Sequence, residues 1–225
     1  MSELFSIQLQ NRQQQGRDGI WLDLPTTTEQ VQAALRQIGI SSDNPQGLFI
    51  SGYFAEEEKR FAIPYNMVLA SNVDELNFLA SRLETLSTGE RAELNAALQA
   101  PQSELFSIGR ITDFPENVDY YVHLPDVHGP AQLGDYYLNR SGMVDMPEEW
   151  KGGIDTAQFG RYVAQQEQGA FTQYGYLVKS GDEWQKVHEG QPVPEEYRVL
   201  SFPAPEVLRD AANIPPPVQP ETEPQ

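Results

Sequence analysis

Residues 113–160 read DFPENVDYYVHLPDVHGPAQLGDYYLNRSGMVDMPEEWKGGIDTAQFG. The stretch carries only two cations, Arg140 and Lys151, against nine acids: Asp113, Glu116, Asp119, Asp126, Asp135, Asp145, Glu148, Glu149 and Asp155. Aromatic residues lie between these acids, namely Tyr120, Tyr121, Tyr136, Tyr137 and Trp150. Aromatic side chains are typical of packed interiors. We therefore expect these carboxylates to be displayed on folded segments, and we interpret them as the functional surface.

The whole chain shares this acidity. It has 225 residues and a net charge of −18, from 33 acidic and 15 basic residues. With 39% hydrophobic residues, it has enough apolar material for one large domain or two to three small ones. A compact body with this charge repels itself, which costs stability. A basic partner is a functional reason for that cost, whereas solubility and halophilic adaptation are the alternatives.

The first third of the chain has the pattern of a small α+β unit. Alternating apolar residues predict strands over 4–9, 20–24 and 48–54. Thr26 and Glu29 have the spacing of a capping box, and the helix that they open ends near Gly39. We therefore predict an N-terminal α+β domain over residues 1–66.

The next section is helical in pattern. Asn72 is placed to cap one helix, and Ser87 with Glu90 forms the capping box of a second. Leucines recur on one face of each helix. This predicts a helical middle domain over residues 67–101.

A second α+β unit is predicted over residues 102–202. It opens on Ser103–Ile108, which repeats the six letters of Ser2–Ile7 and is therefore predicted to be a strand. The other elements expected are strands over 118–124, 171–178, 184–188 and 197–202, short helices that begin at Pro130 and Pro147, and a helix capped by Asp155 or Thr156. Residues 203–225 are rich in proline and are predicted to be a disordered tail.

Chemical motifs are few. His123, Asp126 and His128 offer metal ligands within six residues, but Pro125 breaks the helix that would align them, so we predict no metal site. The chain has no cysteine, no G-x-S-x-G elbow, no Walker loop and no G-x-G-x-x-G turn after a strand. The acids are dispersed, whereas an active site gathers a few of them in a pocket. We therefore predict that the protein is not an enzyme and needs no cofactor.

Direct binding to nucleic acid is also disfavoured, because no window carries a cluster of Lys and Arg. The N-terminus lacks the features of a secretory signal, and no run is apolar enough for a membrane span. A cytoplasmic protein is expected. Duplex DNA bears one charge per about 1.7 Å, so 18 surplus charges match roughly 30 Å of duplex. The chain is thus suited to imitate DNA.

Several short motifs in a shared order resemble the ArdA-type antirestriction proteins, which are acidic DNA mimics carried by plasmids, conjugative transposons and phages. The resemblance covers roughly residues 4–178 and rests on Gly19-Ile-Trp21-Leu-Asp23, Leu48–Tyr53, Val73–Asn77, Leu133-Gly-Asp-Tyr136-Tyr137, Phe159-Gly160-Arg161 and Gly175-Tyr176. The chain departs from the family pattern by a longer insert before Leu133 and by its extension after Val178.

This resemblance implies an elongated α+β protein of three small domains that forms a homodimer. It implies that the protein occupies the DNA groove formed by the methyltransferase and specificity subunits of a type I restriction–modification enzyme. Carboxylates would replace phosphates there, and the residues we assign to this role are the nine acids above together with Glu56, Glu57 and Glu58. Tyr136, Tyr137 and Phe159 are assigned to the core or to a dimer contact. The alternative is an acidic adaptor that binds another basic protein.

Overall fold

The computed structural model describes residues 4–14, 18–41, 45–56 and 60–200. It confirms the α+β class, with two three-stranded antiparallel sheets in the described residues. The strands are β1 (Phe5–Asn11), β2 (Ile20–Leu24), β3 (Leu48–Phe54), β4 (Tyr121–Leu124), β5 (Ala170–Thr172) and β6 (Gly175–Lys179). The α-helices are α1 (Thr28–Gln37), α2 (Tyr65–Leu69), α3 (Val73–Glu84), α4 (Thr88–Gln99), α5 (Ile108–Thr112), α6 (Pro130–Asp135), α7 (Glu148–Lys151) and α8 (Thr156–Glu167). Short turns of 3-10 helix are η1 (Pro45–Gly47), η3 (Phe114–Glu116), η4 (Val118–Tyr120) and η6 (Glu195–Tyr197), and η5 (Tyr136–Arg140) is π-helical.

We call the described residues up to 120 the body. Its sheet has the order β2-β1-β3, and the alternation of β1 buries Phe5, Ile7 and Leu9 on one face. The capping box of α1 is formed by Thr27 and Gln30, one residue later than predicted. The cap by Asn72 predicted for α3 is confirmed, and Glu75 completes it to a capping box. The capping box predicted for α4 is confirmed.

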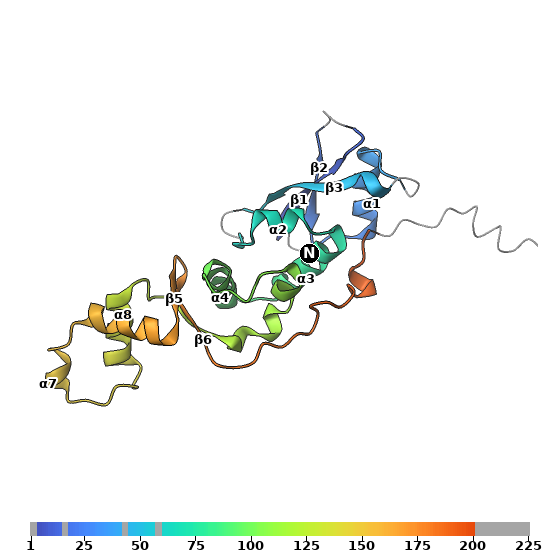
Figure 1. Ribbon diagram of the computed structural model, residues 1–225. Helices are drawn as coiled ribbons and strands as arrows, with labels where there is room; N and C mark the ends of the chain where they lie inside the picture. The colour runs from blue at the N-terminus through green and yellow to red at the C-terminus, as the bar shows by residue number, and fades with distance from the viewer. Residues whose placement is uncertain (1–3, 15–17, 42–44, 57–59, 201–225) are drawn as a thin grey trace, which may run out of the picture.

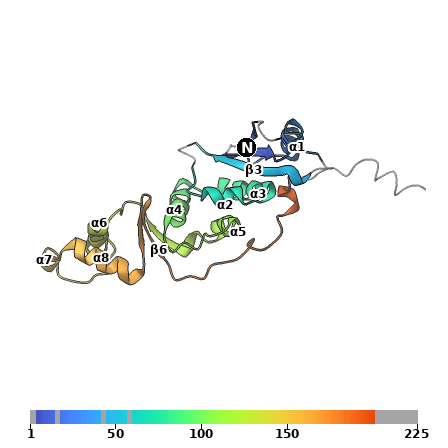
Figure 2. The same cartoon turned by 45° about the horizontal axis from the view of Figure 1, so that its top comes forward.

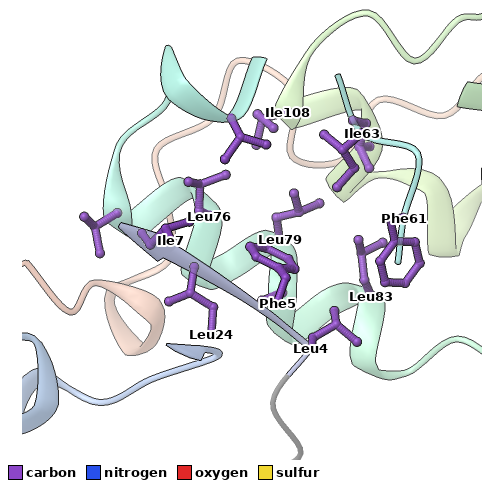
Figure 3. Packing of buried hydrophobic residues seen from close by; sticks show 14 of the residues in the cluster. Leu4, Phe5, Ile7, Leu24, Phe61, Ile63, Leu76, Leu79, Leu83 and Ile108 are labelled. Atoms are coloured by element: carbon purple, nitrogen blue, oxygen red, sulfur yellow. The ribbon is translucent and has the colours of Figure 1, made fainter. Parts of the chain in front are cut away.

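The sheet and the helices of the body share one hydrophobic cluster. Figure 3 shows Leu76, Leu79 and Leu83 of α3 close to Phe5 of β1 and Ile108 of α5. Because the predicted helical middle section packs into the same cluster as the N-terminal sheet, its core is not separate. The division into three domains stays a prediction.

We call residues 121–179 the terminal module. It contains the sheet β4-β6-β5 and the helices α6, α7 and α8, and it projects from one side of the body (Figures 1 and 2). A second, smaller hydrophobic cluster fills it, built on Val127, Leu133 and Tyr176.

The sheet of the terminal module has a buried residue on each face. Along β6, Tyr176 and Val178 pack in the module's cluster, whereas Leu177 between them packs in the cluster of the body. On β4, Tyr121 belongs to the body cluster and Leu124 packs against the module cluster. Successive side chains of a strand point to opposite faces, so this one sheet joins the two cores.

Two glycines set the distance between α6 and α8. A Cβ atom at Gly134 would overlap the carbonyl oxygen of Thr156, and a Cβ atom at Gly160 would overlap that of Pro130. The two helix backbones therefore pack directly on each other, which only glycine allows at these positions.

We call residues 180–200 the strap. After β6 the chain turns back and runs along the body past α5 to η6, as the orange to red segment in Figures 1 and 2 shows. The strand predicted over 184–188 is wrong, because these residues have no strand partner in the described part of the chain. Of the strand predicted over 197–202, residue 197 ends η6, residues 198–200 are unpaired, and residues 201–202 lie outside the described residues. Residues 201–225, with the predicted tail, lie outside the described residues.

Two further predictions are corrected. The segment Ser103–Ile108 is not a strand, although it repeats the letters of 2–7. Ser107 instead accepts a hydrogen bond from the backbone N–H of Arg110 and caps α5. The single strand predicted over 171–178 is a hairpin of β5 and β6, whose turn at residues 173–174 leads into Gly175, with φ 121°, at the start of β6.

Where α4 packs on the segment before β4, the fold buries a carboxyl group. Glu93 is half-buried, and its Oε1 has no hydrogen-bond partner among the described residues. Burial, and then the charges of Glu90 and Asp119, raise the pKa of Glu93 to about 8. An uncompensated carboxylate here costs stability once it ionises.

We predict that Gly160→Ala unfolds the terminal module locally, because its methyl group must push α6 and α8 apart. The expected loss is about 3 kcal/mol or more. Hydrogen exchange should rise in α6 and α8 while the body stays protected. Gly152→Ala is the matched control, since nothing lies within 4 Å of its added Cβ. If α6 and α8 are equally protected from hydrogen exchange in both variants, the direct packing of their backbones is contradicted.

We predict that Glu93→Gln stabilises the protein at alkaline pH. Between the ordinary value of 4.5 and about 8, folded Glu93 keeps a proton that the unfolded chain has lost, so stability falls as pH rises through this window. The variant does not lose stability in this way. Near pH 8.5 its free energy of unfolding should therefore exceed that of the unchanged protein by an amount on the order of 1 kcal/mol, after allowance for solvent screening. Urea unfolding at about pH 5 and about pH 8.5 measures it. Glu183→Gln, an exposed acid, is the control and should show no such gain.

Candidate partner-binding surface

Most of the predicted acids are exposed, namely Glu56, Glu116, Asp119, Asp126, Asp145, Glu148, Glu149 and Asp155. Asp135 is partly buried, and Asp113 is fully buried. Glu57 and Glu58 lie outside the described residues.

Asp113 is fully buried, which corrects its assignment to the surface. Its carboxylate accepts hydrogen bonds from the backbone N–H groups of Val187, His188 and Glu189 in the strap. A carboxylate held in this way has no oxygen to offer a partner protein. Nothing in the sequence distinguished it from the exposed acids, because its partners follow 74 to 76 residues later.

Three of the predicted acids pair with a cation. Glu116 pairs with Arg82, Asp135 with Arg140, and Glu148 with Lys151. The hydrogen bonds from Arg140 and then from Asn139 lower the pKa of Asp135, so it is ionised at neutral pH. These acids remain on the surface, but each is partly neutralised.

The cations themselves are drawn into such pairs. Among the described residues, ion pairs engage Arg82, Arg110, Arg140, Lys151, Lys179 and Lys186. A phosphate-binding surface needs several cations that point outward together. These pairings instead leave the exposed acids as the dominant outward charge.

The fold also gathers acids that the sequence keeps apart. Asp119 of η4 lies near Glu90 and Glu93 of α4, close enough for its charge to raise the pKa of Glu93. The spacing of Glu90 and Glu93 places them on one helix face, but only the packing of α4 on η4 adds Asp119. The acidic surface therefore extends from the terminal module onto the body.

Sequence counts agree with this extension. Residues 121–179 hold seven acids and four bases, whereas residues 1–120 hold 17 acids and eight bases. Half of the net charge thus comes from residues 1–120, and only three of their acids, Asp113, Glu116 and Asp119, belong to the stretch at 113–160. The candidate surface is long and has no single centre.

Tyr136 and Tyr137 are partly buried and pack against the cluster of the terminal module, as expected for the first of their two assigned roles, the core or a dimer contact. The hydroxyls of Tyr137 and Tyr176 both donate to Glu167, and burial followed by Glu167 raises both tyrosine pKa values. These bonds tie η5 and β6 to the end of α8. Phe159 is half-buried.

In the described residues, no group of three His, Cys, Asp or Glu is placed to hold a metal. Nε2 of His123 instead bonds the carbonyl oxygen of Tyr174 at 2.7 Å.

A cavity of about 980 Å³ lies between α3, α5 and the strap. Its acids already have partners. Asp74 accepts the backbone N–H groups of Val199 and Leu200, Glu75 completes the cap of α3, and Glu189 pairs with Arg110. The cavity thus lacks the pair of available carboxylates that a hydrolase would need.

No helix in the described part of the chain is long and apolar enough to cross a membrane. No curated protein matches the chain. The family model of the antirestriction protein ArdA matches residues 15–178, which is well over half of the sequence; it begins after β1 and ends in β6. The chain therefore belongs to the ArdA antirestriction protein family.

Proposed function

We propose that this protein inhibits type I restriction–modification enzymes by imitating duplex DNA. Its exposed carboxylates take the place of phosphates and bind Lys and Arg of the enzyme's DNA groove, formed by the methyltransferase and specificity subunits. Occupying that groove is sufficient for inhibition, so no catalytic residue is required. Family membership supports the antirestriction activity.

The observation that carries the mimicry is the distribution of charge. Exposed acids lie on the body, as Glu56 and Asp119 do, and on the terminal module, as Asp126, Asp145 and Glu149 do. Many of the cations are meanwhile engaged in ion pairs within the chain. A DNA groove recognises charge repeated along a length, and an elongated acidic surface matches this requirement better than a single pocket.

A homodimer would double the length of this surface. One chain carries charge equivalent to roughly 30 Å of duplex at about 1.7 Å per phosphate charge. Exposed apolar residues on the terminal module, Met143, Trp150 and Tyr162, are available for contact between two copies. We include the dimer in the proposal.

We predict that Asp145→Lys with Glu149→Lys strongly weakens inhibition. Each substitution places a like charge against a basic groove, which costs several kcal/mol and thus well over tenfold in affinity. Both positions are exposed, and the structure shows no ion pair that their change would break. Restriction relief in cells and inhibition of the purified enzyme measure the effect.

The control for this prediction is Asp18→Lys with Glu29→Lys, two exposed acids of the body that give the same change in net charge. An equal loss in both double variants would show that only the total charge matters. If the Asp145 and Glu149 variant still inhibits fully, then α7 and the loop before it are not part of the surface that binds the enzyme.

We predict that binding to the enzyme weakens steeply as salt rises from about 0.05 M to about 0.2 M, because salt screens contacts between surface charges. Fluorescence anisotropy with a labelled protein and the methyltransferase–specificity complex measures this. DNA containing the recognition sequence should compete for the same enzyme. If the complex forms at low salt but DNA does not displace the protein, it binds outside the groove, as an acidic adaptor would.

A further inference from the structure

We propose that the strap clamps the terminal module to the body, and that Asp113 is the positioning residue that anchors it. The strap follows the residues matched by the family model, which end at 178. The inference concerns this chain's architecture and deepens the proposed function, because it explains how acids on two separate parts become one rigid surface.

The anchor is a buried carboxylate. Oδ1 of Asp113 accepts the N–H of His188 at 2.6 Å, and Oδ2 accepts those of Val187 at 3.3 Å and Glu189 at 3.2 Å. Hydrogen bonds to an ionised acceptor are stronger than neutral ones, and a buried carboxylate without them would be very costly. The strap and Asp113 therefore depend on each other.

Other side chains of the body hold the strap by its main chain. Asn117 accepts the N–H of Gln185 at 2.7 Å and donates to the carbonyl oxygen of the same residue at 3.0 Å. Further along, Asp74 accepts the N–H groups of residues 199 and 200, and Asn77 donates to the carbonyl oxygen of Tyr197. Because backbone groups are recognised, these bonds determine the path of the strap.

Ring and charge contacts add to this path. Trp184 packs edge-on against Tyr120 at 5.1 Å, and His188 packs against Phe78 at 4.9 Å. Arg110, which is almost fully buried, bonds Glu189 of the strap through Nε at 3.1 Å. The strap is thus attached from the exit of β6 to the start of α3.

The junction between module and body has room to move. A cavity of about 280 Å³ lies there, lined by the end of α4 at 100–102 and by residues 167–170 of the module. Tyr121 and Leu177, which pack in the cluster of the body, also line this cavity. A partly filled junction of this kind permits hinge bending, and a second attachment through the strap opposes it.

Rigidity has a functional consequence. An inhibitor that is already in its binding shape loses less conformational entropy on association. The clamp would therefore strengthen binding without touching the enzyme. Asp113 would act through the strap and not as a phosphate substitute.

Distance measurements between two spin labels test the clamp directly. The chain has no cysteine, so Gln37→Cys at the end of α1 and Gln165→Cys on α8, both exposed, supply two unique labelling sites. In the otherwise unchanged protein we expect one narrow distance distribution. Asp113→Ala should broaden it, and Asp113→Asn, which keeps one acceptor oxygen, should broaden it less.

Asp126→Asn is the matched control, because it removes the same charge from an exposed turn of the module, and its distribution should stay narrow. A second experiment leaves Asp113 unchanged. A protease site inserted between Gly181 and Asp182 allows the strap to be cut after the protein has folded, and cutting should also broaden the distance distribution. If Asp113→Ala does not fold, the cut protein alone tests whether the strap clamps the module. A distance distribution that stays narrow after cutting, or in folded Asp113→Ala, would contradict the proposed clamp.

Inhibition assays separate this proposal from the function on which it rests. Folded Asp113→Ala should inhibit less than Asp18→Asn, which changes an exposed acid outside the predicted binding set, although both variants lose one negative charge. If Asp113→Ala broadens the distance distribution while no substitution of an exposed acid affects inhibition, the DNA mimicry is contradicted and the clamp is supported. If inhibition depends on the exposed acids but the distance distribution stays narrow, the clamp is contradicted and the mimicry is supported.

Discussion

The alternation of side chains along β6 is the constraint on which the rest of this structure depends. Tyr176 and Leu177 are neighbours in the chain, yet they belong to different hydrophobic clusters because successive residues of a strand face opposite ways. The sheet of the terminal module is therefore also a wall of the body's core. A shift of β6 by one residue would exchange the two faces and remove apolar contacts from both clusters at once.

Charge adds a second constraint on top of this packing. The chain carries a net charge of −18, so folding must hold acids close together against their repulsion. Asp113 shows how a buried acid is accommodated, since three backbone N–H groups replace its lost hydration. Glu93 shows the opposite case, in which burial and then the charges of Glu90 and Asp119 raise the pKa, and Oε1 has no hydrogen-bond partner in the described part of the chain. The structure thus separates acids that serve the fold from acids that remain available to a partner.

Local physical chemistry explains why much of the secondary structure was predictable. The capping boxes at Asn72 and Ser87 involve residues three apart, so they can be read directly from the chain. The strand pattern of β1 and β3 could be read in the same way. The hexapeptide at 103–108 was misread because a strand also needs a neighbour. Phe5–Ile7 lies in a strand that is paired on both sides, whereas Ser107 is followed by residues that continue as α5.

The sequence by itself determined the α+β class, the helices with local caps, the acidity and the motifs of the ArdA family, because each depends on composition or on residues close together in the chain. Only the tertiary structure decided which acids face outward. It buried Asp113 under the strap, brought Asp119 to α4, and neutralised Glu116 with Arg82. The physical reason is that burial and pairing depend on contacts between distant segments, and one carboxylate in a sequence looks like any other until its neighbours in space are known.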